Sequence, residues 1–256
     1  MNRIDALFKE KDRNILSVYF TAGYPKLDDT LEIIMELEKA GVDQIEIGMP
    51  FSDPLADGPI IQQSSQKALE NGMSIRLLFK QLEKVREKVR IPLILMGYLN
   101  PVLRYGMEEF LKKAREIGID GVILPDLPLI EYVHSYKQQF SNAGIYNIML
   151  ITPQTTFERI KLIDQHSGGF VYMVSSAATT GTSKNIFDAH NDYFCKIIEM
   201  NLEKPRLIGF GIANRESFKQ ACKYANGAII GTAFIRAVSE PGSLRENISG
   251  FIGEIL

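Results

Sequence analysis

The amino-acid sequence predicts an α/β fold, a single (β/α)8 TIM barrel that spans residues 1–256. From Ile15 onward, short apolar runs rich in β-branched residues alternate with longer amphipathic segments, which is typical of parallel strands joined by helices. No linker or change of composition divides the chain, so one barrel is favoured over an open doubly wound sheet or two small domains. The eight predicted strands are 15–21, 44–48, 91–96, 121–124, 146–151, 170–174, 206–209 and 227–231.

The segments between these runs have the periodicity of amphipathic helices, as in 27–40 and 107–117. Their apolar stripes contain Leu31, Ile34, Leu37 and Ala40 in the first, and Phe110, Leu111 and Ala114 in the second. A glycine follows three of the predicted helices, where a positive φ is favoured: Gly41, Gly118 and Gly144.

Residues 1–14 predict an extra N-terminal helix that packs over the rest of the fold. Ile4, Leu7 and Phe8 recur at helical spacing among charges of both signs. The acidic residues in this segment disfavour a transit peptide, and no apolar run is suited to a signal peptide or a membrane span.

Charge and cysteine content exclude several function classes. The formal net charge is -2, the isoelectric point is about 6.0, and lysine and glutamate are interspersed. Without a basic patch, neither nucleic acid nor an anionic membrane is an expected partner. Cys195 and Cys222 lack CxxC spacing and a nearby histidine, which argues against a metal site and a disulfide framework. The expected location is therefore the cytoplasm.

Acidic residues gather at the end of the second predicted strand, in the segment EIGMPFSDPLADGP at 46–59. A strand buried on both faces is expected to be almost entirely apolar, so Glu46 requires a reason. A carboxyl group at the carboxyl end of such a strand is a candidate general acid or base, and a salt bridge at the strand end is the structural alternative. Burial there is expected to raise the pKa of Glu46 towards neutrality, whereas Asp57, in a polar loop, is expected to stay ionised.

In a (β/α)8 barrel the functional residues are expected in the loops that follow the strands. The polar residues that stand out do follow strands: Glu46, Asp53 and Asp57 after the second, Tyr98 and Asn100 after the third, Asp126 after the fourth, and Thr180 and Gly181 after the sixth.

Three loops rich in small residues predict a phosphate site. They are SSAATTGTS at 175–183, GFGI at 209–212, and GTAFI at 231–235, where a short helix is expected to begin at Thr232 or just after. Backbone N–H groups at a helix start favour anions, and barrels often bind phosphate after strands 7 and 8. None of the three segments contains lysine or arginine, so amide dipoles and hydroxyls would hold the phosphate.

Several motifs of this sequence resemble those of one family. The motif PFSDPLADGP after an IEIG strand, Tyr172 before a threonine-glycine loop, GFGI and IIGTA are similar to the tryptophan synthase α subunit, over about residues 1–250. The resemblance implies a carbon–carbon lyase that cleaves indole-3-glycerol phosphate to indole and glyceraldehyde 3-phosphate, with no metal or organic cofactor in this chain. It implies that Glu46 shuttles protons at indole C3 and at the glycerol hydroxyl, and that Asp57 accepts the indole N–H.

The resemblance also implies which residues bind the substrate. Thr180 matches the threonine that closes onto the aspartate, although a turn hydroxyl is its simpler interpretation. The expected indole pocket consists of Tyr19, Ile61, Tyr98, Ile123, Tyr172 and Phe210, each of which is also explained by core packing. The expected phosphate contacts are Gly181, Gly211, Gly231 and Thr232.

The loop at 175–183 departs from the family pattern. Ser176 stands where well-known relatives have arginine, and Ala178 stands where they have glycine or serine. Alanine lacks the access of glycine to positive φ, so we expect loop closure and coupling to the partner to be altered.

The resemblance implies a partner, a β subunit that carries pyridoxal phosphate, receives the indole and makes L-tryptophan in an α2β2 heterotetramer. The matching contact positions are Asp53, Pro54, Asn100 and Pro128. Three alternatives stay open. They are a free-standing lyase that releases indole, a catalytically silent activator of the β subunit, and a barrel that acts on a related substrate, such as indole-glycerol phosphate synthase, which would require a lysine within a strand.

Overall fold

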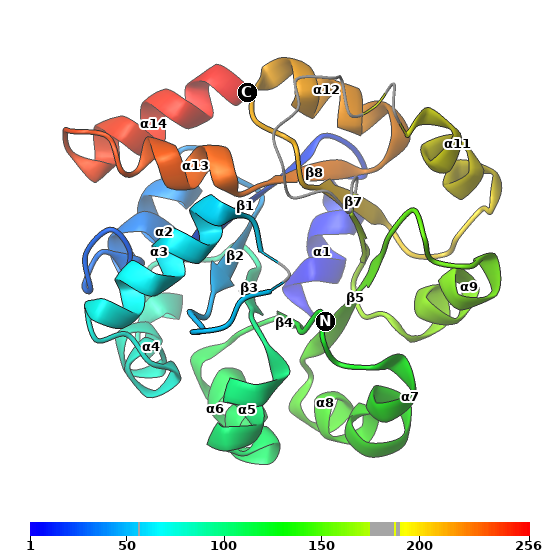
Figure 1. Cartoon of the computed structure of the whole chain (residues 1–256), viewed down its shortest axis with the longest axis horizontal. Helices are drawn as coiled ribbons and strands as arrows, with labels where there is room; N and C mark the ends of the chain where they lie inside the picture. The colour runs from blue at the N-terminus through cyan, green and yellow to red at the C-terminus, as the bar shows by residue number, and fades with distance from the viewer. Residues whose placement is uncertain (56, 175–186, 188–189) are drawn as a thin grey trace.

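The computed structural model describes residues 1–55, 57–174, 187 and 190–256, and its eight parallel strands close into a barrel in sequence order (Figure 1). The predicted fold is thereby confirmed. The third strand begins two residues later than expected, after Pro92, which has no N–H to donate to a neighbour. The strands are β1 Ile15–Thr21, β2 Gln44–Gly48, β3 Leu93–Met96, β4 Gly121–Ile123, β5 Tyr146–Ile151, β6 Val171–Val174, β7 Arg206–Gly209 and β8 Gly227–Ile230.

Helices surround the barrel and cover its outer surface (Figure 1). A 3₁₀-helix, η1 Val85–Glu87, precedes β3, and a π-helix, η2 Tyr132–Tyr136, follows α7. The α-helices are α1 Arg3–Glu10, α2 Thr30–Lys39, α3 Pro59–Glu70, α4 Ile75–Leu82, α5 Leu99–Tyr105, α6 Met107–Ile117, α7 Leu129–Glu131, α8 Lys137–Ala143, α9 Phe157–His166, α11 Asn191–Glu199, α12 Arg215–Tyr224, α13 Thr232–Ala237 and α14 Leu244–Ile255.

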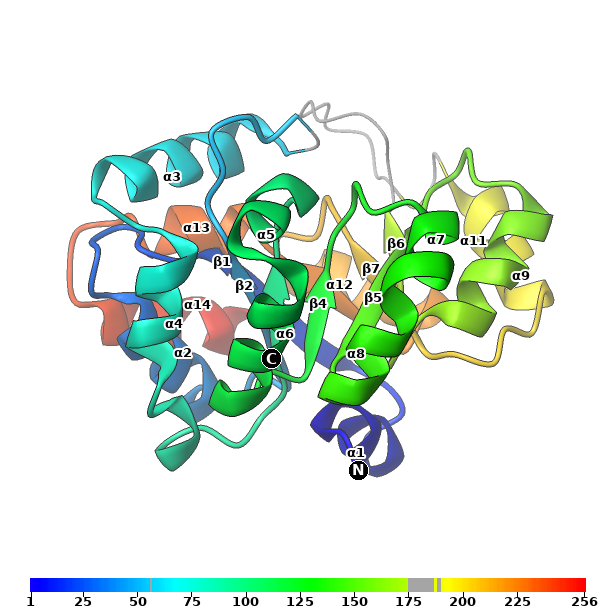
Figure 2. The same ribbon diagram turned by 90° about the horizontal axis from the view of Figure 1, so that it is seen from below.

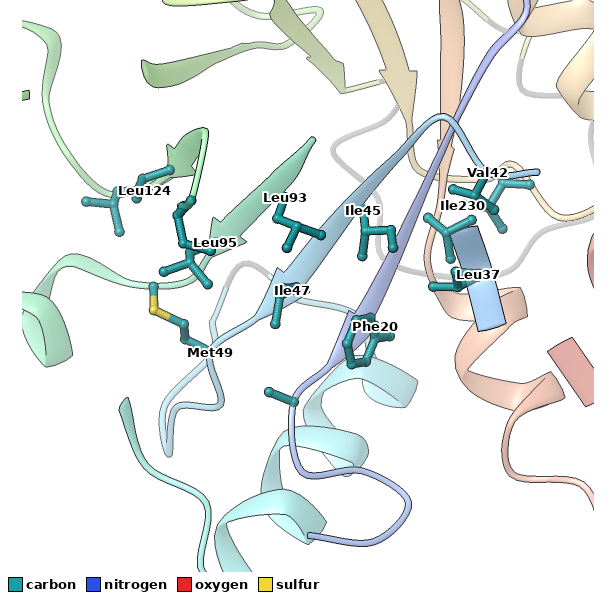
Figure 3. Packing of buried hydrophobic residues seen from close by; sticks show 14 of the residues in the cluster. Phe20, Leu37, Val42, Ile45, Ile47, Met49, Leu93, Leu95, Leu124 and Ile230 are labelled. Carbon is teal, nitrogen blue, oxygen red and sulfur yellow. The ribbon is translucent and has the colours of Figure 1, made fainter. Parts of the chain in front are cut away.

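Alternate residues of each strand face opposite sides of the barrel wall, as the pleat of a strand requires. The outward side chains of β2 and β3, Ile45 and Ile47 beside Leu93 and Leu95, lie in the apolar layer between strands and helices, where α2 contributes Leu37 (Figure 3). All five are fully buried. This layer contains most of the hydrophobic core and fixes the positions of the helices around the barrel.

The inward side chains form a second, smaller cluster inside the barrel. Helix α1 closes one end of this interior, opposite the end where α3 lies (Figure 2). Ile4 of α1 is fully buried in the cluster, and the Phe8 ring lies 6.0 Å from that of Phe170. The predicted N-terminal helix is confirmed, and it seals the barrel. The buried members of the cluster are Ile4, Ile15, Tyr19, Ile94, Ile123, Ile148, Phe170, Tyr172, Val174, Leu207, Ile229 and Ile235.

Asp120 attaches α1 and η1 to the sealed end of the barrel. Its carboxylate forms ion pairs with Arg3 at 3.0 Å and with Arg86 at 2.5 Å, and it accepts the backbone N–H of Leu93 at 2.9 Å. Only 3% of the side chain is exposed. A buried carboxylate with these partners is costly to remove, because the Leu93 N–H loses its acceptor and both guanidinium groups lose their counter-charge.

Replacing Asp120 by alanine is expected to lower the free energy of unfolding by about 3 kcal/mol, because it leaves the buried Leu93 N–H without its acceptor and the largely buried Arg86 without its ion pair. Urea denaturation followed by circular dichroism measures this change. Glu109→Ala is the matched control, because Glu109 is exposed and lies 3.8 Å from Lys112, and we expect it to cost less than about 0.5 kcal/mol. Equal effects of the two substitutions would contradict the role given to Asp120.

Candidate active site

Glu46 lies inside the barrel, on the inward face of β2. Its side chain is fully buried, and no cationic side chain of the described residues forms an ion pair with it, so these residues supply none of the salt bridge that the structural alternative requires. Ser17 donates a hydrogen bond to Oε1 at 3.0 Å, and Oε2 has no hydrogen-bond partner among the described residues. Burial raises the pKa of Glu46 to about 8, against the opposing effect of the Ser17 hydrogen bond. The carboxyl group is therefore mostly protonated at neutral pH.

Asp57 is held at the end of the barrel where α3 begins. Its N–H donates to the Pro54 carbonyl at 3.0 Å, and its own carbonyl accepts from Gln62 Nε2 at 2.8 Å. The hydroxyl of Tyr98 donates to Asp57 Oδ2 at 3.1 Å. The surroundings are less polar than expected: the side chain is partly buried, and this burial raises the pKa of Asp57 to about 6, although the hydrogen bond from Tyr98 lowers it. Asp57 is still mostly ionised at neutral pH.

Asp57 faces a cavity with mainly apolar walls. The cavity is lined by Tyr19, Asp57, Ile61, Met96, Tyr172, Phe210, Ile229, Gly231 and Thr232. Four of the six predicted indole contacts are among these residues. Tyr98 lines an adjoining cavity that shares Tyr19, Asp57 and Met96. Ile123 lies in the interior cluster and is not among the residues that line either cavity.

The sequence reasoning missed Met96 and Ile229 as cavity residues. Both lie at or near the carboxyl ends of their strands, and both have the parity of inward residues: Met96 is two positions after Ile94, and Ile229 is two positions before Gly231. Extending the alternation of each strand to its last residue would have identified them.

Two tyrosines that line the cavity lie near both Glu46 and Asp57, and two strand glycines make room for them. Tyr19 pairs with Glu46 in the register of β1 and β2. A Cβ atom at Gly48 would collide with the Tyr19 hydroxyl, and one at Gly209 would collide with the Tyr172 hydroxyl. Burial raises the pKa of both tyrosines, and the charges of Glu46 and Asp57 raise it further. Both hydroxyls therefore stay protonated and able to donate.

The loops after β7 and β8 agree only in part with the phosphate site that the glycine pattern predicts. Helix α13 begins at Thr232, as expected, and Gly231 and Thr232 line the cavity that contains Asp57. Gly211 has φ 74° and is exposed, but it is not among the lining residues. Phe210 has φ 70°, a strained value for a residue with a side chain, and its ring lies 6.3 Å from that of Tyr172.

The other predicted site residues fall into two groups. Thr180, Gly181, Ser176 and Ala178 lie outside the described residues. The predicted partner contacts follow β2, β3 and β4: Asp53, Asn100 and Pro128 are exposed and Pro54 is partly so. Asp126 joins two of these loops, because both its carboxylate oxygens accept the N–H of Leu99, at 2.9 and 3.0 Å.

The described residues contain no group of three or more His, Cys, Asp or Glu side chains that could hold a metal ion. Among the helices they form, none has the length and apolar character to cross a membrane.

Known proteins match this chain along its whole length. The family model described as tryptophan synthase alpha chain matches residues 6–250. The tryptophan synthase alpha chain of Flavobacterium psychrophilum is 57% identical over 255 residues, which is 100% of both chains, and that of Christiangramia forsetii is 53% identical, covering 100% of this chain and 98% of the relative.

Solved structures match the barrel equally well. The crystal structure of tryptophan synthase subunit alpha from Legionella pneumophila gives a TM-score of 0.89 at 32% identity, covering 100% of this chain and 97% of the other. A chain of the tryptophan synthase complex from Pyrococcus furiosus gives 0.85 at 32% identity, covering 96% and 98%. The chain therefore belongs to the tryptophan synthase alpha chain family.

Proposed function

We propose that this chain cleaves indole-3-glycerol phosphate to indole and glyceraldehyde 3-phosphate by a retro-aldol reaction, as a carbon–carbon lyase of its family. The observation that carries the mechanism is the difference in protonation state between two carboxyl groups, Glu46 inside the barrel and Asp57 at its rim. Burial keeps Glu46 mostly protonated at neutral pH, while Asp57 is mostly ionised and faces the apolar cavity. Two titratable groups with separated pKa values are the arrangement that acid and base roles require.

The two carboxyl groups take complementary roles in the proposed reaction. Glu46 begins protonated and gives its proton to C3 of the indole, which makes the ring an electron sink. Asp57 accepts the indole N–H and stabilises the cation that forms. The Glu46 carboxylate then removes the proton of the glycerol hydroxyl, the bond between C3 and the side chain breaks, and its electrons return to the ring. One proton moves from the hydroxyl to C3, and Glu46 ends protonated again.

The cavity supports a flat apolar ring with a phosphate beyond it. We assign the indole to the walls formed by the aromatic and aliphatic residues, and the phosphate to the start of α13, where Gly231 and Thr232 face the same cavity as Asp57. The other contacts rest on the family resemblance. The proposed indole residues are Tyr19, Ile61, Tyr98, Ile123, Tyr172 and Phe210, with Thr180 closing onto Asp57, and the proposed phosphate residues are Gly181, Gly211, Gly231 and Thr232.

The family name and the Pyrococcus complex support a β subunit as the partner. We place its contact surface on the loops after β2, β3 and β4, at Asp53, Pro54, Asn100 and Pro128. Two large apolar side chains next to these residues are exposed, Leu55 at 90% and Ile130 at 68%, which is suited to an interface. The proposed assembly is an α2β2 heterotetramer in which the β subunit holds pyridoxal phosphate and this chain holds no cofactor.

An assay of indole release, with and without added β subunit, distinguishes the proposal from its alternatives. We expect weak activity of the chain alone and strong stimulation by the β subunit, because loops that exclude water must close over the site. High activity that is independent of the β subunit would favour the free-standing lyase. No activity with the β subunit present would contradict the lyase proposal and favour the silent activator.

Glu46→Gln is expected to lower kcat/KM for indole release by about 10³-fold or more, because the amide has no proton to exchange. Asp57→Asn is expected to lower it by about 10²-fold, because the charge opposite the indole N–H is lost. Glu70→Gln is the control, since Glu70 is exposed near the end of α3 and should retain full activity. Near-normal cleavage by either site variant would refute the role given to that residue.

The pH dependence of kcat/KM is expected to be bell-shaped, with an acidic limb near pH 6 and a basic limb near pH 8. The acidic limb follows ionisation of Asp57, whose pKa is raised by burial to about 6. The basic limb follows loss of the Glu46 proton, since burial raises the pKa of Glu46 to about 8. Steady-state assays from pH 5 to 10 measure both limbs, and activity that persists well above pH 9 would contradict the starting state given to Glu46.

A further inference from the structure

Three polar side chains form a hydrogen-bonded chain inside the barrel, below the cavity. Gln44 Nε2 donates to Ser17 Oγ at 3.2 Å, and Ser17 Oγ donates to Glu46 Oε1 at 3.0 Å. Ser17 and Gln44 are paired in the register of β1 and β2, one inward position before Tyr19 and Glu46. All three side chains are fully buried. Glu46 is therefore attached to the barrel wall by one continuous chain that runs from the sealed side of the interior towards the cavity.

Stability alone does not account for these polar residues. Most other inward positions of the strands are apolar, and Gln44 Oε1 has no hydrogen-bond partner among the described residues. A buried amide oxygen without a partner costs free energy, and a well-packed aliphatic side chain would avoid that cost. The hydrogen bonds that the two residues do make all lead to Glu46.

The donors along the chain fix which oxygen of Glu46 is held. The Gln44 amide nitrogen can only donate, so it occupies a lone pair of the Ser17 hydroxyl and leaves the Ser17 proton for Glu46 Oε1. Resting on the function proposed above, we infer that Ser17 and Gln44 are positioning residues: they hold Glu46 through Oε1 and leave Oε2 as the oxygen that exchanges the proton with the substrate.

The same chain sets the acidity of Glu46. The titratable groups that face it are Tyr19 of β1 and Tyr172 of β6, both of which stay neutral, and Asp57 acts on the same two tyrosines. Among these surroundings, the hydrogen bond from Ser17 is the interaction that favours the charged carboxylate. Removing the Ser17 hydroxyl therefore raises the pKa of Glu46 and moves the basic limb of the activity profile to higher pH.

Ser17→Ala tests the inference in the full-length chain, with indole release measured from pH 5 to 10. We expect the basic limb of kcat/KM to move up by about one pH unit, as expected for loss of one charge-assisted hydrogen bond. We also expect kcat at the optimum to fall about tenfold, because Glu46 loses its fixed orientation. The acidic limb, which belongs to Asp57, should stay in place.

Ser167→Ala is the matched control. Ser167 is also a buried serine of the barrel, and its hydroxyl accepts from the Met149 N–H at 3.0 Å and donates to the Phe170 carbonyl at 2.7 Å. This substitution removes a buried hydroxyl that does not contact Glu46, so it can lower stability but should leave both limbs unchanged. A shift of the basic limb in Ser17→Ala no larger than that in Ser167→Ala would overturn the inference.

Gln44→Met provides a second, independent test, because methionine has a similar shape and no donor. We expect a smaller upward shift of the basic limb, and we expect Gln44→Met to cause no further shift in the Ser17→Ala background, since Gln44 acts through Ser17. Additive shifts of the basic limb in the double variant would contradict the proposed hydrogen-bonded chain from Gln44 through Ser17 to Glu46. If the wild-type chain releases no indole with the β subunit present, the proposed function fails, and if Glu46→Gln retains activity, the role proposed for Glu46 fails. If Glu46→Gln is inactive and Ser17→Ala keeps the wild-type profile, only this inference fails.

Discussion

The structure depends on one unusual constraint, an ionisable carboxyl group enclosed in the interior of a closed barrel. Glu46 has one hydrogen-bond donor, Ser17, and no cationic partner among the described residues, so its environment favours the neutral acid. That state is useful only if water cannot reach the carboxyl group from the far end of the barrel. Helix α1 meets this need, because Ile4 and Phe8 fill the end of the interior opposite the cavity. A helix at the end of the barrel opposite the cavity thereby helps to keep Glu46 protonated.

The second carboxyl group shows how the same barrel end supports the opposite protonation state. Asp57 is also buried enough for its pKa to rise, but the Tyr98 hydroxyl donates to it and keeps that rise moderate. The Asp57 N–H donates to the Pro54 carbonyl and the Asp57 carbonyl accepts from Gln62, and these two hydrogen bonds fix its backbone at the start of α3. The two groups differ in protonation near pH 7 because Glu46 lies in the interior of the barrel and Asp57 lies at its rim.

The fold was predictable from the sequence because its signals are local. Apolar runs alternate with amphipathic segments, and seven of the eight strands were placed within one residue at each end; the third differs because Pro92 lacks an N–H. Glu46 was predictable for the same reason, since a glutamate in a buried strand contradicts the pattern around it. The environment of Asp57 was not, because its burial comes from Tyr98 and from the neighbouring loops, which are far away in the sequence. Ser17 and Gln44 were also not predictable as site residues, because their connection to Glu46 depends on the register between β1 and β2.

The protonation state of Glu46 in the folded protein tests the account most directly, and it requires neither substrate nor partner. Carboxyl carbons labelled with ¹³C report ionisation by their chemical shift, and the resonance of Glu46 is the one missing from Glu46→Gln. The account predicts a resonance that is still that of a protonated acid at pH 7 and that titrates near pH 8. A resonance that is fully ionised by pH 6 would contradict it, because Glu46 could then not begin the reaction as the acid.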